Sequence, residues 1–205
     1  MTTESINLFV VDDDEAVRRS LGLLFLSQGH AVQTFSMGEA FLATANLNDG
    51  GCVILDLRMG SMMSGLQVFD ELRARASALA VLFLSGNGDI AVAVAAVQKG
   101  AFGWLEKPCD DERLLEKVQD ALAWSSAQRV RLCARRAADA LWQKLTPREK
   151  EVARLVADGH PNKVIARQLA PIEPRTIESH RAHVFAKLRL SNSNELDRFL
   201  REHAL

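Results

Sequence analysis

The chain has 205 residues, of which 48% are hydrophobic and 25% are charged, so it can form two domains with apolar cores and is too apolar to be disordered. Residues 1–124 hold 9 Lys and Arg against 17 Asp and Glu, whereas residues 125–205 hold 16 against 9. This asymmetry is typical of a protein in which one part handles cations or phosphate chemistry and the other binds a polyanion, although two solvated surfaces would give the same counts.

The sequence contains no sign of export or membrane insertion. The N-terminus lacks the basic segment of a signal peptide, and no run reaches the roughly 20 apolar residues of a membrane helix. Cys52, Cys109 and Cys133 lack the spacing of metal ligands and are expected to be free thiols. We therefore expect a soluble cytoplasmic protein with no membrane partner.

The first 124 residues alternate between short apolar runs and helical stretches. Five consecutive βα units predict a doubly wound α/β domain with a five-stranded parallel sheet, in which ligands bind at the carboxyl ends of the strands. The expected strands are Ile6–Val11, Val32–Phe35, Cys52–Leu55, Ala80–Leu84 and Gly103–Leu105, and helices are expected near residues 14–27, 37–45, 65–75, 89–99 and 110–124.

Residues 125–144 contain no Gly or Pro and predict a helical linker that could continue the preceding helix. Apolar residues between Val130 and Leu145 recur at helical spacing, which fits either a face packed on a partner helix or a solvated connector.

After Leu145 every signal is helical. Thr146-Pro147-Arg148-Glu149 forms a capping box with proline at the first helical position, and Gly159 is expected to end that helix. Three more helices are expected at Asn162–Leu169, Pro174–Leu188 and Asn194–His203. Four short helices with tight turns predict an all-α helix-turn-helix domain over residues 145–205.

Polar side chains follow the expected strands of the first domain. Asp12-Asp13-Asp14 follows the first strand, Asp56 the third, Ser85 the fourth and Lys107 the fifth. Clustered carboxylates repel one another unless a cation holds them, and their oxygens suit Mg²⁺. Asp56 is the candidate nucleophile for phosphoryl transfer, while Asp12 and Asp13 are candidates to hold the metal. Helix N-capping is the alternative role for the acidic triplet.

Four motifs in this half resemble the receiver domain of two-component response regulators over residues 6–122. They are Phe9-Val10-Val11-Asp12-Asp13-Asp14, Leu55-Asp56-Leu57-Arg58-Met59, Leu84-Ser85-Gly86 and Glu106-Lys107-Pro108. The resemblance implies that a sensor histidine kinase phosphorylates Asp56, and that Asp12, Asp13, Asp56 and the backbone carbonyl of Arg58 hold Mg²⁺. It also implies that Lys107 and Ser85 contact the phosphoryl group and that Trp104 changes rotamer with Ser85, although Trp104 could be an ordinary half-buried aromatic.

The sequence departs from the receiver pattern in three places. Gly60 stands where proline is usual, and one residue is inserted between it and Gly65, so a looser loop is expected over the phosphorylation site. Ser85 replaces the usual threonine, and Cys109 replaces a common aromatic residue. None of these changes removes a group that the chemistry requires.

Three segments of the C-terminal half carry a second resemblance: Leu145-Thr146-Pro147-Arg148-Glu149, Asn162-Lys163 and Arg175-Thr176-Ile177-Glu178-Ser179-His180-Arg181. They resemble the DNA-binding domain of the FixJ/NarL family, which has a LuxR-type helix-turn-helix. The resemblance implies that Pro174–Leu188 is the recognition helix, placed in the major groove. Glu178 could accept from a cytosine amino group or serve only to favour the helix N-terminus. Pro171 lengthens the preceding turn. The residues expected to contact DNA are Arg148, Lys163, Arg167, Arg175, Thr176, Glu178, Ser179, His180, Arg181, Ala182 and Lys187.

Together these features predict a transcriptional regulator that is switched by phosphorylation of Asp56. We expect it to form a homodimer on activation, to bind a pseudo-palindromic promoter site in double-stranded DNA and to contact RNA polymerase. Its only expected chemistry is self-phosphorylation from small phosphodonors and slow self-dephosphorylation. The alternatives are a regulator whose receiver is a phosphorylation-independent dimerisation or docking module, and a phosphatase of the haloacid-dehalogenase type, which the basic helical C-terminus disfavours.

Overall fold

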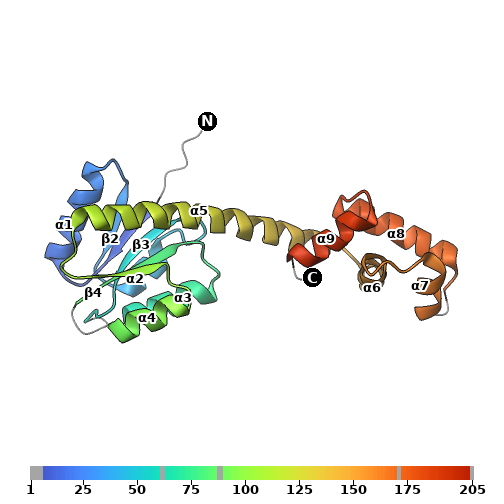
Figure 1. Ribbon diagram of the computed structural model, residues 1–205, viewed down its shortest axis with the longest axis horizontal. Coiled ribbons are helices and arrows are strands. Elements are labelled where there is room, and N and C mark those ends of the chain that lie inside the picture. Colours follow the sequence, from blue (N-terminus) through green and yellow to red (C-terminus); the bar gives the residue numbers. More distant parts are fainter. Residues whose placement is uncertain (1–6, 61–62, 87–89, 170–171, 204–205) are drawn as a thin grey trace. The chain divides into compact units, whose positions relative to one another are not determined.

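The computed structural model describes residues 7–60, 63–86, 90–169 and 172–203, and the chain forms two compact units, residues 1–130 and 131–205 (Figure 1). Among the described residues, no helix is both long enough and apolar enough to cross a membrane. The two units are taken in turn.

The first unit is built on a five-stranded parallel sheet with the strand order β2-β1-β3-β4-β5. The predicted doubly wound fold is therefore confirmed, and each observed strand lies within one residue of its expected bounds. Ile6, the expected start of the first strand, lies outside the described residues. The strands are β1 (Asn7–Val11), β2 (Val32–Phe35), β3 (Gly51–Asp56), β4 (Ala80–Ser85) and β5 (Gly103–Glu106).

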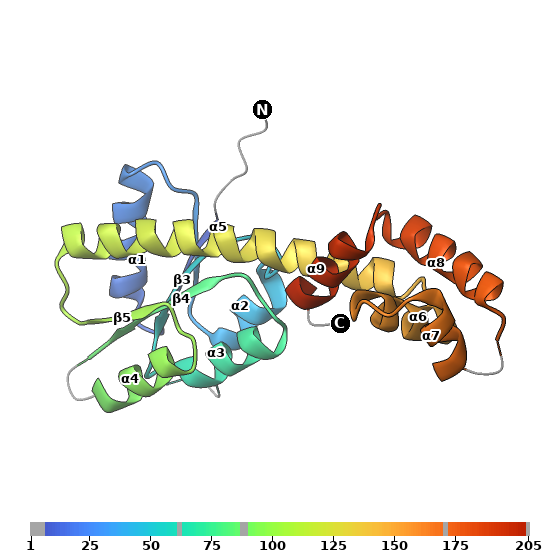
Figure 2. The same cartoon turned by 45° about the vertical axis from the view of Figure 1, so that its right-hand side comes forward.

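Helices cover both faces of this sheet (Figures 1 and 2). One apolar core joins α2, α3 and α4 to strand residues such as Phe83, and the other joins α1 and α5 to strand residues such as Leu82. Both central strands, β3 and β4, are buried along their whole length, as expected for a parallel sheet with two covered faces. The helices are α1 (Glu15–Ser27), α2 (Gly38–Thr44), α3 (Gly65–Ala74), α4 (Ile90–Gln98) and α5 (Asp111–Trp142).

Helix α5 continues through the predicted linker as far as Trp142, so the expectation of a continuous helix is confirmed. The buried hydroxyl of Ser125 donates to the carbonyl of Ala78 at 2.6 Å and accepts from the amide of Gly51 at 2.8 Å. These bonds attach α5 to the sheet one residue beyond the expected end of the first domain.

The second unit contains four helices after α5 among its described residues: α6 (Pro147–Ala157), α7 (Asn162–Gln168), α8 (Pro174–Leu188) and α9 (Ser193–His203). The capping box is present, because the Thr146 side chain accepts from the Glu149 amide and the Glu149 side chain accepts from the Thr146 amide. A core that includes Trp142, Ile165, Ile177 and Leu196 joins these helices. Pro171 lies outside the described residues, so its effect on the turn stays a prediction.

Candidate functional site

The carboxyl ends of β1, β3, β4 and β5 bring Asp12, Asp56, Ser85 and Lys107 together, as the strand order requires. Strand pairing places Asp56 opposite Leu84 and Ser85 opposite Glu106. Asp12 and Asp56 are buried polar residues with 2% and 6% exposure. Because isolated buried carboxylates are costly, their burial side by side indicates a site that is built to hold a cation.

Lys107 supplies one positive charge to this site. Its ammonium donates to Oδ2 of Asp12 at 2.6 Å and to Oδ1 of Asp56 at 3.0 Å. Burial alone would lower the pKa of Lys107, but the hydrogen bonds to the two carboxylates outweigh it and raise that pKa. The lysine therefore remains charged and bridges the two strand ends.

Burial raises the pKa of Asp56, and Lys107 offsets this effect only in part. Repulsion from Asp12 and Asp13 raises the pKa of Asp56 further. One ammonium is thus insufficient to balance three carboxylates, so a second cation would relieve the remaining repulsion.

The acidic triplet divides into two roles. Asp14 is the N-cap of α1, because its side chain accepts from the amides of Ala16 and Val17, so the capping alternative applies to this residue. Asp12, Asp13 and Asp56 each offer one carboxylate oxygen, and these three oxygens lie within 4.8 Å of one another. Hard carboxylate oxygens at this spacing fit Mg²⁺, and the residues therefore fit the expected metal.

The loop between β3 and α3 is attached to the site at two described points. The amide of Gly60 donates to Oδ2 of Asp13 at 2.6 Å, and the amide of Gly65 donates to the carbonyl of Leu57 at 3.3 Å. A Cβ on Gly65 would lie 2.1 Å from the carbonyl oxygen of Asp56, so only glycine fits this approach. These contacts hold the described residues on both sides of the insertion. Residues 61 and 62 lie outside the described part, so the expected looser loop stays a prediction.

Ser85 and Trp104 are in direct contact. The indole nitrogen of Trp104 donates to the hydroxyl oxygen of Ser85 at 3.0 Å, and Ser85 is fully buried. The Ser85 hydroxyl donates in turn to the Gly86 carbonyl at 3.4 Å. Sequence reasoning paired these two residues only through the family resemblance, and the hydrogen bond that joins them could not be read from their spacing.

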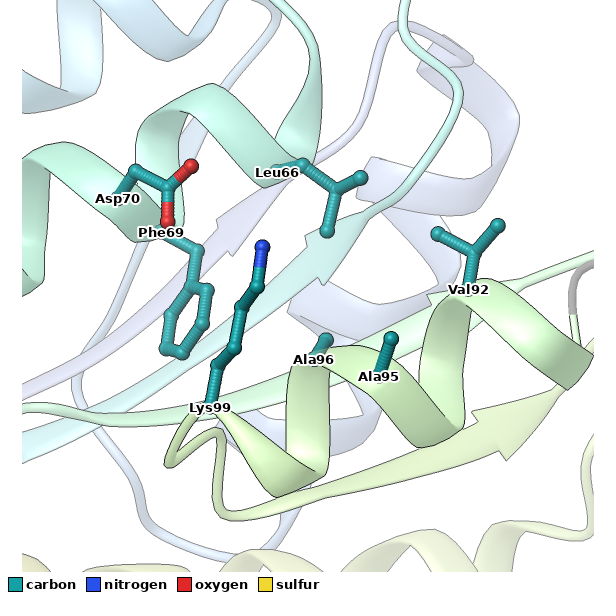
Figure 3. A pocket seen from close by; sticks show the side chains of 7 residues that line it. All are labelled: Leu66, Phe69, Asp70, Val92, Ala95, Ala96 and Lys99. Atoms are coloured by element: carbon teal, nitrogen blue, oxygen red, sulfur yellow. The ribbon is translucent and has the colours of Figure 1, made fainter.

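A separate groove of about 300 Å³ lies between α3 and α4 (Figure 3). Leu66 and Phe69 of α3 face Val92, Ala95 and Ala96 of α4 across it, and Asp70 and Lys99 add one charge of each sign. None of these residues is a candidate ligand of the carboxylate site.

The predicted DNA-contacting residues of α7 and α8 are mostly exposed. Ile177, Val184 and Leu188 face the core, which leaves the opposite side of α8 to solvent. The exposed candidates are Lys163, Arg167, Arg175, Thr176, Glu178, Ser179 and Ala182, and His180 is half-buried.

Three of the cations that are predicted to contact DNA also have partners within the domain. Lys187 donates to both carboxylate oxygens of the buried Glu149, at 2.8 and 2.6 Å, and Arg181 donates to Oδ1 of Asn162 at 2.8 Å. Arg148 donates to Glu151 and to the carbonyl of Leu169. These side chains thus join α6, α7 and α8 in this structure, and their contact with DNA stays a prediction.

The fold and the acidic site define a receiver-type domain joined to a helix-turn-helix domain, and comparisons with known proteins agree. Residues 8–119 match the response regulator receiver domain, and residues 143–200 match the LuxR family of bacterial regulatory proteins. The chain belongs to the FixJ/NarL family of two-component response regulators, which regulate transcription.

Similar proteins span almost the whole chain. The transcriptional regulatory protein FixJ of Azorhizobium caulinodans is 39% identical over 195 residues, which cover 95% of this chain and 92% of FixJ. The C4-dicarboxylate transport transcriptional regulatory protein DctR of Rhodobacter capsulatus is 41% identical over 196 residues, covering 95% and 98%. The solved structure of the response regulator StyR is 32% identical, with a TM-score of 0.77 and coverage of 97% of this chain and 99% of StyR.

Proposed function

We propose that Asp56 is the phosphoryl acceptor of this response regulator and that a sensor histidine kinase is its donor. An oxygen of Asp56 bonds to phosphorus while the phosphorus–nitrogen bond to the kinase histidine breaks, and the released imidazole nitrogen takes a proton. The product is an acyl phosphate on Asp56. The observation that carries the proposal is the Lys107 ammonium, which contacts both Asp12 and Asp56 at the sheet edge.

Asp12, Asp13, Asp56 and the backbone carbonyl of Arg58 would hold Mg²⁺, which supplies positive charge against the phosphoryl oxygens. Lys107 would exchange its bond with Asp56 for one with the phosphoryl group, because that group adds negative charge next to the ammonium. The hydroxyl of Ser85 would turn towards the same group, and Trp104 would then lose its acceptor. This exchange is the proposed switch.

The proposed output is DNA binding by α8 in the major groove. Lys163, Arg167 and Arg175 would contact phosphates, because their side chains are exposed cations. Phosphorylation would favour a homodimer that binds a pseudo-palindromic promoter site and contacts RNA polymerase in the cytoplasm. The exposed side chains proposed to face the base edges are Thr176, Glu178, Ser179 and Ala182, together with the half-buried His180.

The test is incubation with Mg²⁺ and acetyl phosphate, followed by intact mass and light scattering. We expect one labile phosphoryl adduct and a shift towards dimer in the wild type, and no adduct in Asp56→Asn. Asp120→Asn is the matched control, because Asp120 is an exposed carboxylate on α5. A wild type that binds Mg²⁺ and DNA but forms no adduct would favour the docking-module alternative, and repeated turnover of a phosphate ester would favour the phosphatase alternative.

A further inference from the structure

A backbone amide from the β3–α3 loop contacts one member of the carboxylate cluster. The nitrogen of Gly60 donates to Oδ2 of Asp13 at 2.6 Å, although the two residues are 47 positions apart. Gly60 stands where the receiver pattern has proline, and proline has no amide hydrogen to donate. This hydrogen bond is therefore available to the present chain because of its departure from the pattern.

The surroundings of Gly60 hold its amide close to the carboxylate. The preceding residue, Met59, is 8% exposed and packs in the core that contains Phe83. A Cβ on Gly60 would lie 3.2 Å from Oδ2 of Asp13, so the backbone lies closer to the carboxylate than a larger residue comfortably permits. The absence of a side chain and the presence of an amide hydrogen both serve the same contact.

Asp13 is the member of the cluster that needs such a contact. Asp12 and Asp56 are buried, and Lys107 holds both of them. Asp13 is exposed. An exposed side chain loses rotamer freedom when it binds an ion, unless another group has already fixed its orientation.

We propose that Gly60 is a positioning residue of the Mg²⁺ site, whose amide orients Asp13 before the ion binds. The inference rests on the proposed metal site and adds a residue that coordinates nothing itself. Groups that hydrogen-bond to metal ligands fix their orientation, and their loss weakens metal binding. Restoring the family's proline at position 60 should therefore weaken Mg²⁺ binding by this chain.

Calorimetric titration of the full chain with Mg²⁺ alone, without a phosphodonor, provides the measurement. We expect Gly60→Pro to raise the Kd by roughly ten- to hundredfold, the usual effect of removing a group that hydrogen-bonds to a metal ligand. Gly60→Ala keeps the amide and should cause a smaller increase. Gly22→Ala is the matched control, because Gly22 lies within α1 and a Cβ there would make only an ordinary contact of 3.7 Å with Thr34, so its Kd should equal that of the wild type.

The same titration in an Asp13→Ala background separates the hydrogen bond from a distorted loop. If Gly60 acts through Asp13, the proline substitution should change the Kd little in this background. An equal loss in both backgrounds, or unchanged binding by Gly60→Pro, would overturn the inference and leave the metal site standing. A wild type that binds no Mg²⁺ would instead overturn the metal site, and the inference with it.

A urea midpoint for each variant shows whether the fold survives. If Gly60→Pro is unfolded, the cycle is run with Gly60→Ala, whose Cβ would press on Oδ2 of Asp13. Gly60→Ala must then bind Mg²⁺ more weakly than the wild type. In the Asp13→Ala background, the same substitution must leave the Kd for Mg²⁺ unchanged. Equal binding by Gly60→Ala and the wild type would then count against the inference.

Discussion

Trp104 and Ser85 are joined by a hydrogen bond in which the indole nitrogen donates to the hydroxyl oxygen across 3.0 Å. The two residues lie on neighbouring strands, at β5 and at the end of β4. A group that draws the Ser85 hydroxyl towards Asp56 would take this acceptor from the indole. The half-buried indole could then change its environment, so its fluorescence reports on the state of the site.

We therefore expect acetyl phosphate and Mg²⁺ to shift the tryptophan emission of the wild type. Trp104→Phe should abolish the shift, although Trp124 and Trp142 remain, and Ser85→Ala should greatly reduce it while Asp56 is still phosphorylated. Fluorescence and intact mass are measured on the same samples. An undiminished shift in Trp104→Phe would place the conformational change elsewhere.

Asp56→Asn should stabilise the first unit in metal-free buffer at neutral pH, by on the order of 1 kcal/mol. Burial raises the pKa of Asp56 in the folded state, so folding favours the protonated carboxyl over the carboxylate. The folded state is therefore not penalised below the ordinary pKa of an aspartate, and it loses stability as the pH rises through the folded pKa. The gain should consequently shrink as the pH falls through the folded pKa of Asp56, and it should be lost below the ordinary pKa of an aspartate.

Urea denaturation with and without Mg²⁺ measures this effect. Mg²⁺ should stabilise the wild type more than Asp56→Asn, because the variant lacks one ligand. Equal stabilisation of both proteins would show that Asp56 takes no part in holding the ion. Asp120→Asn again provides the control.

Lys187→Met should destabilise the second unit by about 2 kcal/mol at pH 7, because it removes the ammonium that donates to both carboxylate oxygens of the buried Glu149. Burial opposes ionisation of Glu149, but the bonds from Lys187 and Thr146 outweigh it and lower the pKa. The stabilisation that Lys187 gives to the folded domain is thus present above the ordinary pKa of a glutamate. It is lost as the pH falls through the pKa of Glu149 in the folded state.

The measurement is denaturation followed by Trp142 fluorescence, in a chain whose Trp104 and Trp124 are phenylalanine. Arg201→Met is the control, since its pair with Asp197 on α9 is exposed and should contribute little. If Lys187→Met lowered the free energy of unfolding at pH 7 no more than Arg201→Met does, the ion pair between Lys187 and Glu149 would not stabilise the domain.

Lys163→Ala and Arg175→Ala should weaken binding to duplex DNA and lower the salt slope by about 1 each, because each removes one exposed cation from the proposed interface. Arg201→Ala on α9 should leave both quantities unchanged. Fluorescence anisotropy at several salt concentrations gives the slopes. Equal losses from Arg201→Ala would indicate an effect of net charge rather than contact through α7 and α8.

Local signals in the sequence were sufficient for most of the fold. The alternation of apolar runs located all five strands, and Thr146 with Glu149 fixed the start of α6, because both patterns depend on neighbours within a few residues. The partners of Lys187 and Gly60 lie 38 and 47 residues away. Periodicity carries no information on which distant groups meet, so neither the Lys187–Glu149 ion pair nor the Gly60 donor was predicted.

Ser125 determines where the receiver can be separated from the rest of the chain. Its hydroxyl accepts from an amide at the start of β3 and donates to a carbonyl two residues before β4. A fragment that stopped at Trp124 would lose both bonds together, whereas one that continued to Val130 would keep them. The shorter fragment should melt at a lower temperature, and where α5 is cut would govern how faithfully an isolated receiver represents the intact protein.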